Sequence, residues 1–191
     1  MTALTVNFNS IIKLTDEQFY QLCQDNSDLR FERNAKGELI IMPPAGGETS
    51  NRNGRLTQQL MNWTDADGTG IAFDSSGGFK LPNGADRSPD ASWVKLERWN
   101  ALTSEQQKKF LPLCPDFVVE LLSPSDSLKD TQDKMKEYRE NGAILGWLIN
   151  RKNRQVEIYR PGEEVEVLDN PERLAGEPVL PGFVLNLELI W

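Results

Sequence analysis

The sequence predicts an α/β protein in which helices flank a mixed β-sheet core and extra β-hairpins are attached to it. Helical periodicity recurs in three segments, at 14–26, 48–64 and 128–140. The run PDFVVELL at 115–122 is continuous and β-branched, which is typical of a central strand covered on both faces. Strand-like segments lie between and after the helical ones, and this order favours a sheet with helices on its faces.

The N-terminal half is expected to hold two helices and a hairpin. Thr15, followed by acidic residues, is expected to cap the helix at 14–26. Two short apolar runs flank 34–37, whose Asn and Gly are typical of a hairpin turn. The helix at 48–64 carries its apolar residues on one face and begins at or near Glu48.

The chain after residue 68 is expected to hold most of the strands. Short apolar pieces at 69–94 are separated by glycine and proline, as strands joined by turns are. Ser123 and Ser125 have no neighbouring base, and we expect them to cap the helix at 128–140. A surface helix is expected at 103–110, and further strands at 143–150, 154–160 and 163–169.

Length and composition indicate one domain spanning residues 1–191. A chain of 191 residues can bury roughly 70% of the surface that its unfolded form exposes, which allows a full core. The apolar runs are far shorter than the about 20 residues of a membrane helix, and the N-terminus lacks the features of a secretory signal. We therefore expect a cytoplasmic protein without a membrane span. Cys23 and Cys114 lack CxxC spacing and are expected to be core thiols.

The sequence contains no histidine, and this absence narrows the possible chemistry. It excludes Ser-His-Asp and Cys-His arrangements and every histidine-ligated metal site. Catalysis has to use carboxylates, lysine, tyrosine or a hard metal ion. The net charge of −8 argues against nonspecific coating of nucleic acid. The segment 127–154, with seven basic and four acidic residues, still allows a small basic face on an acidic body.

Two acidic residues are notable because they fall in or beside predicted strands. Asp90 lies at the edge of one strand, and Glu120 lies inside the run at 115–122. An ionised Glu in a buried apolar strand is costly unless a positive or hydrogen-bonding group compensates it. A divalent cation of the Mg²⁺ type, shared with Asp90, would do so. A salt bridge to Arg or Lys, or a water-exposed edge position, would explain Glu120 equally well.

The helix at 128–140 adds a lysine to these acids. Asp130, Lys134 and Tyr138 follow i, i+4, i+8 spacing and form one stripe along the helix. Lys134 lies at the boundary of the apolar face, 14 residues after Glu120. Spacing alone favours an ordinary helix ion pair between Asp130 and Lys134 over a catalytic lysine.

Four ordered segments carry a resemblance to a known family: IMPPAGGETSNRNGRL, FDSSGGFKLPNGADRSPDASWV, PDFVVELLSPSD and KDTQDKMKEYRENGAILGWLIN. From about residue 15 onward the sequence resembles the Uma-two family of restriction endonucleases, formerly domain-of-unknown-function family 820. The resemblance implies the restriction-endonuclease-like fold of the PD-(D/E)XK nuclease superfamily, with the nuclease core at about 28–160. It also implies hydrolysis of nucleic-acid phosphodiesters, above all in DNA, with Mg²⁺ or Mn²⁺ as cofactor. A homodimer is compatible with action on two strands.

The resemblance also implies site residues. Pro89 and Asp90 match the PD element of the superfamily, and Glu120 matches its D/E position. Both acids are expected to be catalytic. Glu48 matches an acid of the first helix that some members use as an additional metal or water ligand. With the backbone carbonyl of Leu121, these carboxylates are expected to hold the metal ion.

The lysine departs from the usual pattern of the superfamily. Leu122 stands two residues after Glu120, where the strand lysine is normally found. Lys134, with Tyr138 four residues later, matches the slot of a lysine that has moved to the following helix. The resemblance therefore makes Lys134 the third catalytic residue, with Tyr138 and Asp130 in support.

Two other classes of function stay open on the sequence alone. A nuclease-fold module that binds nucleic acid or a protein partner without cleaving it agrees with the missing strand lysine and the charge of −8. The other class is a metal-free carboxylate pair, as in a glycoside hydrolase. It is disfavoured because the tryptophans are scattered, which is more typical of packing than of a sugar-binding groove.

Overall fold

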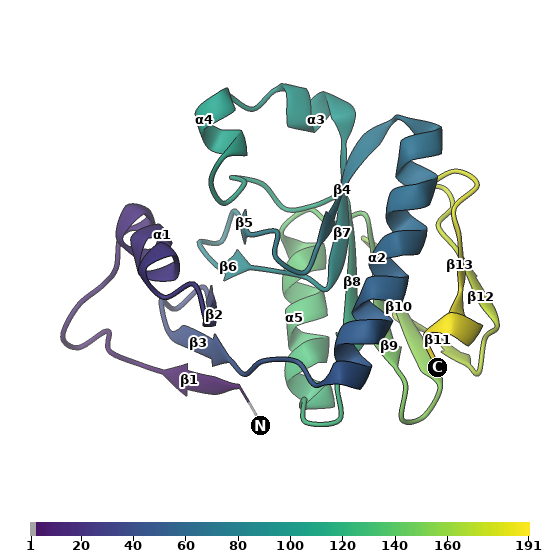
Figure 1. Cartoon of the computed structure of the whole chain (residues 1–191), viewed down its shortest axis with the longest axis horizontal. Coiled ribbons are helices and arrows are strands. Elements are labelled where there is room, and N and C mark those ends of the chain that lie inside the picture. Colours follow the sequence, from purple (N-terminus) through teal and green to yellow (C-terminus); the bar gives the residue numbers. More distant parts are fainter. Residues whose placement is uncertain (1–2) are drawn as a thin grey trace.

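The computed structural model describes residues 3–191, and its main feature is a six-stranded sheet flanked by helices (Figure 1). One central pair of strands is parallel and the other neighbours are antiparallel, so the sheet is mixed, as the sequence predicts. Across the sheet, the strands are β11 (Glu166–Asp169), β10 (Gln155–Tyr159), β9 (Leu145–Asn150), β8 (Phe117–Leu122), β7 (Ala91–Lys95) and β4 (Gly70–Asp74).

Strand β8 is central and separates two parts of the core. Phe117, Val119 and Leu121 belong to one hydrophobic cluster, whereas Val118 belongs to the cluster on the opposite face. Because side chains alternate along a strand, Glu120 shares the face of Val118. The central strand covered on both faces, expected from the sequence, is confirmed, and the alternation fixes the side of the sheet on which the Glu120 carboxylate lies.

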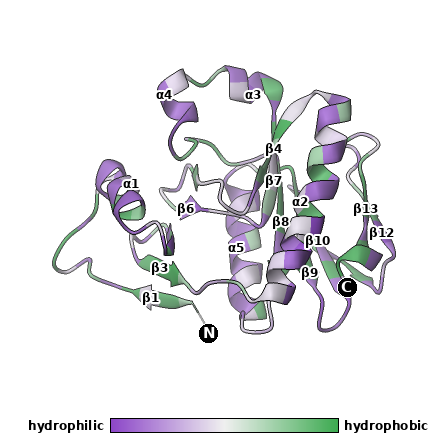
Figure 2. Ribbon diagram, viewed as in Figure 1, coloured by the Kyte–Doolittle hydropathy of each residue, from purple (hydrophilic) through white to green (hydrophobic). Residues whose placement is uncertain are grey.

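Helices α2 (Gly47–Asp67) and α5 (Leu128–Glu140) cover opposite faces of this sheet (Figure 1). Leu56 and Leu60 of α2 join the cluster of Phe117, and Met135 and Tyr138 of α5 join the other cluster. Figure 2 shows hydrophobic colouring on the central strands and mixed colouring along both helices, as amphipathic packing requires. Helix α5 connects the parallel strands β8 and β9, so its inward face lies over Glu120.

A second, five-stranded sheet is attached to the first by the chain segment that precedes Asp90. The hairpin predicted at 34–37 is confirmed, with Gly37 at φ 84° in its turn. Helix α1 (Asp16–Asp25) begins at the predicted cap, Thr15, and packs Phe19 against this sheet. The strand order is β1 (Leu4–Val6), β3 (Leu39–Met42), β2 (Arg30–Arg33), β6 (Asp86–Arg87) and β5 (Phe79–Lys80).

The remaining elements complete the two faces of the core. Leu185 and Leu187, near the C-terminus, are buried in the cluster that also contains Leu56 of α2. The helix expected at 103–110 is present in shorter form as α4. These elements are α3 (Leu96–Asn100), α4 (Ser104–Gln107), β12 (Arg173–Ala175), β13 (Val184–Asn186) and the 3-10 turn η1 (Leu187–Leu189).

One predicted cap is wrong. Helix α5 is capped by Ser127, whose Oγ accepts a hydrogen bond from the Asp130 backbone N–H at 3.3 Å. Ser123 and Ser125 instead lie 3.2 Å apart, Oγ to Oγ, in the loop before the helix. All three serines precede the helix, but only Ser127 stands at the distance from its first turn that capping requires.

The two cysteines lie against hydrophobic clusters, as expected. Burial raises the pKa of the Cys114 thiol to about 12 and that of the Cys23 thiol to about 11. Both thiols are therefore protonated at neutral pH and poor nucleophiles. Within residues 3–191, no helix is both long and apolar enough to cross a membrane.

Candidate active site

The pairing of β7 with β8 brings Asp90 to Glu120. Ala91 pairs with Val119 in antiparallel register, so the preceding residue, Asp90, reaches the level of Glu120. The Leu121 backbone N–H donates a hydrogen bond of 2.8 Å to Asp90 Oδ2, which fixes the Asp90 carboxylate beside β8. The structure therefore brings together two acidic residues that lie 30 positions apart in the sequence.

The second oxygen of Asp90 is held by a residue that sequence reasoning missed. Asn53 of α2 donates a hydrogen bond of 2.7 Å from Nδ2 to Asp90 Oδ1. Asn53 lies on the inward face of α2, three and seven residues before the buried Leu56 and Leu60, but its neighbours in the sequence are polar, so the amide carries no distinctive signal. Its function becomes visible only once α2 is placed across the sheet.

Helix α5 supplies two groups to the same oxygen of Glu120. Lys134 Nζ lies 2.8 Å from Glu120 Oε1, and the Tyr138 hydroxyl donates to that atom at 3.0 Å. Tyr138 is fully buried, and the Lys134 side chain is 15% exposed. The alternative of a helix ion pair with Asp130 is wrong, because Lys134 pairs with other carboxylates and Asp130 is exposed.

The other carboxylate bound to Lys134 is Glu32 of β2, which sequence reasoning also missed. Glu32 Oε1 lies 2.8 Å from Lys134 Nζ and accepts a hydrogen bond of 3.0 Å from the Ser88 backbone N–H. Glu32 Oε2 accepts from Arg87 at 2.9 Å, and the whole residue is only 3% exposed. A glutamate in the short run RFER was a weak signal, since its partners are far away in the sequence.

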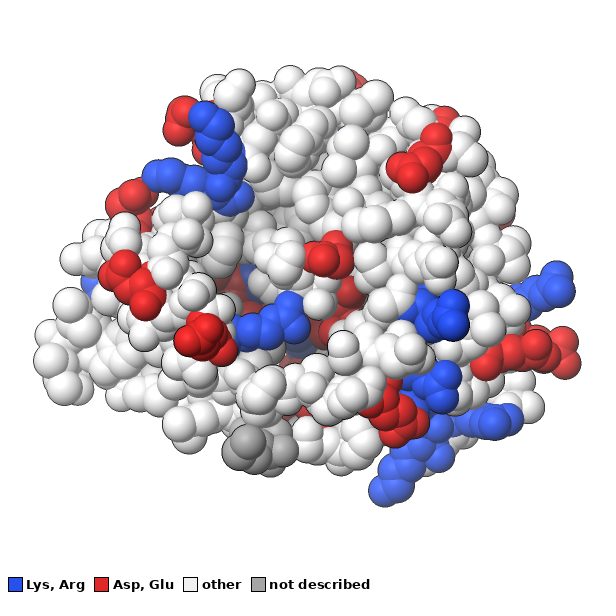
Figure 3. Space-filling view, viewed as in Figure 1, with Lys and Arg blue, Asp and Glu red and all other residues white. Residues whose placement is uncertain are grey.

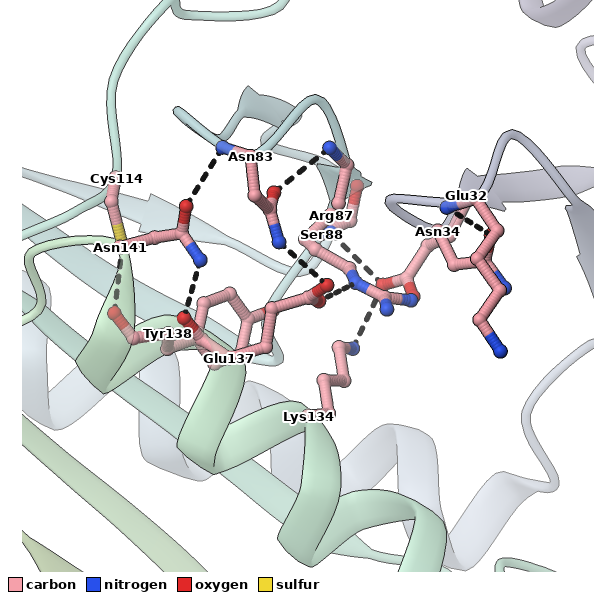
Figure 4. A network of polar contacts seen from close by, with 12 residues as sticks. Glu32, Asn34, Asn83, Arg87, Ser88, Cys114, Lys134, Glu137, Tyr138 and Asn141 are labelled. Carbon is pink, nitrogen blue, oxygen red and sulfur yellow. Dashed lines mark hydrogen bonds and ion pairs between the residues drawn. The ribbon is translucent and has the colours of Figure 1, made fainter.

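These contacts form a closed ring of alternating charge (Figure 4). Lys134 binds Glu32, Glu32 binds Arg87, and Arg87 Nε donates to Glu137 at 2.6 Å. Glu137 lies one turn after Lys134 on α5, so the helix itself closes the ring. The ring has two positive and two negative members and is neutral without Asp90 and Glu120.

The pKa shifts follow this distribution of charge. Burial acts to raise the pKa of Glu32, but Lys134 and Arg87 outweigh it and lower that pKa to about 2. Burial raises the pKa of Glu120 to about 7, and repulsion from Asp90 contributes to the rise while Lys134 opposes it. Burial also raises the pKa of Asp90, against the hydrogen bond from Leu121. Both carboxyls of the pair are therefore harder to ionise than an ordinary carboxyl, and a nearby cation would favour their ionised forms.

Glu48 lies outside this cluster of contacts. It occupies the first turn of α2, and its carboxylate is paired with the Arg151 guanidinium just after β9. Its side chain is 65% exposed, and none of its contacts among the described residues is with Asp90 or Glu120. Leu122, at the position of the usual strand lysine, is half-buried at the end of β8.

The donor set fits a hard divalent cation. No group of three or more His, Cys, Asp and Glu side chains within residues 3–191 is arranged to hold a metal. Mg²⁺, however, is commonly bound by one or two carboxylates, and water and substrate phosphates complete its octahedral shell. The carboxylate oxygens of Asp90 and Glu120, which belong to neither acid of the ring, match that chemistry in type.

A groove of about 430 Å³ lies beside Asp90. Arg30 of β2, Asn53 and Thr57 of α2, and Asp74 of β4 contribute to its lining. Figure 3 shows that this face of the molecule is hollowed near its middle, with charged side chains of both signs in the hollow. Asn53 lines the groove and also binds Asp90, so one side chain connects the groove with the carboxylate pair.

The mixed sheet, with α2 and α5 on its faces, defines a protein of the restriction-endonuclease-like class. The chain belongs to the Uma2 (Uma-two) family, described as putative restriction endonucleases, whose model matches residues 16–188. Its structure is similar to that of a putative nuclease belonging to DUF820 from Anabaena variabilis ATCC 29413. The TM-score is 0.77 at 22% sequence identity, over 93% of this chain and 97% of that chain. No curated protein matches the chain.

Proposed function

We propose that the protein is a divalent-metal-dependent endonuclease that hydrolyses phosphodiester bonds of nucleic acid, with DNA as its substrate. The observation that carries this proposal is the pair formed by the half-buried Asp90 and the buried Glu120, held side by side with Lys134 2.8 Å from Glu120. Family membership supports it, because restriction-endonuclease-like proteins generally use divalent metal ions. The groove lined by Asn53 supports it too, since its amide, hydroxyl and guanidinium groups suit phosphate and sugar oxygens.

Asp90 and Glu120, with the backbone carbonyl of Leu121, would hold Mg²⁺ or Mn²⁺. When bound, such an ion polarises the scissile phosphate and lowers the pKa of a water molecule. Asn53 and the Leu121 N–H orient the Asp90 carboxylate, and Tyr138 orients that of Glu120. These contacts hold the two carboxylates in place before substrate arrives, which is what efficient catalysis requires.

Lys134 acts as a cation in this mechanism. Burial acts to lower its pKa, but Glu120 and Glu32 outweigh burial and raise it, so the side chain stays protonated. A protonated lysine donates hydrogen bonds and does not accept a proton. It therefore orients the attacking water or offsets negative charge that develops on the phosphate. Glu48, apart from the pair in this structure, is proposed to hold the water shell of a second ion.

Cleavage of supercoiled plasmid and of a labelled DNA duplex tests the proposal. Wild-type protein is expected to cleave with Mg²⁺ or Mn²⁺ and to stop when EDTA is added. Asp90→Asn should abolish cleavage and keep the fold, while Glu48→Ala should reduce it. Metal-independent cleavage, or full activity of Asp90→Asn, would refute the proposal. Binding of the duplex without turnover would instead indicate a noncatalytic nuclease-fold module.

A further inference from the structure

Lys134 reaches the carboxylate pair from a helix and contacts two acids at equal distance. Its Nζ lies 2.8 Å from Oε1 of both Glu32 and Glu120. A lysine ammonium is a compact charge on a flexible stem of four carbons, so one contact does not fix its position. If Glu120 were its only partner, the ammonium would neutralise the negative charge of Glu120, which a bound cation needs.

Glu32 is rigidly held, and its anchors do not involve the carboxylate pair. One oxygen accepts from the Ser88 N–H and the other from Arg87. Arg87 is in turn fixed by Glu137 at 2.6 Å, as Figure 4 shows. Glu32 thus offers Lys134 a fixed negative partner that belongs to the five-stranded sheet.

We propose that Glu32 is a positioning residue, which holds the Lys134 ammonium beside Glu120 and balances its charge so that Asp90 and Glu120 stay available to a cation. This inference rests on the proposed metal-dependent function and adds to it a residue outside the superfamily motif. Glu32 does not touch substrate or metal in this scheme. It acts through Lys134.

The inference predicts opposite effects for the two partners. Glu32→Gln keeps the shape of the side chain but leaves the ammonium to Glu120, so the affinity for a divalent cation should fall. Lys134→Met removes the positive charge, so the affinity should stay equal or rise. At short range a unit charge in a partly buried site changes ion affinity by about tenfold or more.

Calorimetric titration with Mg²⁺ and with Mn²⁺ tests this prediction on the full chain. Asp86→Asn is the matched control, because Asp86 is also 3% exposed and is paired with Arg33 at 2.7 Å, outside the ring. We expect Glu32→Gln to lose about tenfold or more in affinity, and Asp86→Asn to stay within about twofold of wild type. Glu32→Asp should restore part of the loss.

A second variant covers the case in which Glu32→Gln fails to fold. Glu137→Gln removes the carboxylate that anchors Arg87, at a less buried position. Arg87 then competes with Lys134 for Glu32. The loss of cation affinity should be smaller than in Glu32→Gln but in the same direction. Cleavage kinetics add a further readout. Both variants should lower kcat and leave KM for DNA unchanged, whereas a purely structural defect would lower stability alone.

The outcomes separate the two proposals. A wild-type protein that binds neither ion refutes the metal-dependent function and this inference together. A wild type that binds and cleaves, with Glu32→Gln equal to Asp86→Asn in affinity, overturns the role of Glu32 alone. If the wild type binds metal without cleaving DNA, the nuclease proposal fails, and the affinity comparison still decides the role of Glu32.

Discussion

A single ammonium, that of Lys134, contacts two carboxylates whose pKa values shift in opposite directions. Glu32 has Arg87 as a second positive neighbour, and its pKa falls to about 2. Glu120 has Asp90 as a negative neighbour, and burial with this repulsion raises its pKa to about 7. Burial acts to raise both pKa values, so the opposite directions come from the charges around each group. Glu32 has two cationic partners, Lys134 and Arg87, whereas Glu120 has Lys134 alone and shares it with Glu32.

The low pKa of Glu32 predicts a pH dependence of stability. The pKa is 4.5 in the unfolded chain and about 2 in the folded protein, so the folded state binds fewer protons between these values. The stabilisation is complete above the unfolded value and is lost as the pH falls through the folded one. Urea unfolding measures the free energy of unfolding of wild type and of Glu32→Gln. The difference between the two should shrink by about 2 kcal/mol between about pH 6 and about pH 3. A margin independent of pH would contradict this assignment.

Two lysines of α5 should differ sharply in their effect on cleavage. Lys134→Ala should lower kcat by about a hundredfold or more, because it removes a charge aimed at the reacting phosphate. Lys136→Ala is the matched control, since Lys136 is half-exposed and pairs with Asp133 on the surface of the same helix. Initial rates on a labelled duplex measure both. Equal losses in the two variants would remove Lys134 from the mechanism.

At the scale of elements, the sequence predicts what depends on local pattern. The continuous run of β8 and the periodicity of α2 and α5 are visible in it, and all three are present. Strand β5 falls within the short apolar pieces expected at 69–94, whereas β6, Asp86–Arg87, consists of two charged residues and has no apolar pattern of its own.

The candidate site also contains residues that the sequence predicts and residues that only the structure reveals. Asp90, Glu120 and Lys134 lie within motifs, and the structure brings all three together. Glu32 and Asn53 come from elements that only the tertiary fold carries to the site, with Glu32 separated from Arg87 by 55 residues. Glu48 illustrates the reverse, since its position in a motif did not reveal Arg151 as its partner.

Substitution by alanine should have opposite effects on stability at two glycines. A Cβ at Gly70, the first residue of β4, would lie 2.2 Å from the buried indole of Trp93 on β7. Gly70→Ala should therefore destabilise the protein by about 1–3 kcal/mol. Gly54 lies in the middle of α2 with open space around its Cβ position, so Gly54→Ala should stabilise by about 0.5–1 kcal/mol. Chemical denaturation measures both, and two shifts of the same sign would contradict the packing described for β4.

At the scale of the whole molecule, an acidic chain of net charge −8 places two of its carboxylates, those of Asp90 and Glu120, side by side at its central sheet. Buried like charges oppose folding unless something compensates them. The protein without metal therefore gives up stability at the pair of Asp90 and Glu120, which is common at functional sites. A bound cation should recover that stability for the entire fold.

Metal addition should accordingly raise the melting temperature. At a concentration about a hundredfold above Kd, Mg²⁺ or Mn²⁺ should add about 2.7 kcal/mol to the free energy of unfolding of wild type. Asp90→Asn should be at least as stable as wild type in EDTA and should not respond to the ion. Thermal unfolding with and without metal measures both effects. An equal response of the variant would place the ion elsewhere.

The strand β6 joins the five-stranded sheet immediately before the chain enters β7 and the site. Arg87 of that strand and Glu32 of its neighbour meet α5, which belongs to the six-stranded sheet. If Glu32 positions Lys134 as proposed, the affinity for a cation depends on the contact between the two sheets. Local opening between the two sheets would separate Glu32 from Lys134 and leave the ammonium to Glu120. A partly unfolded molecule would then bind a cation more weakly and be less active.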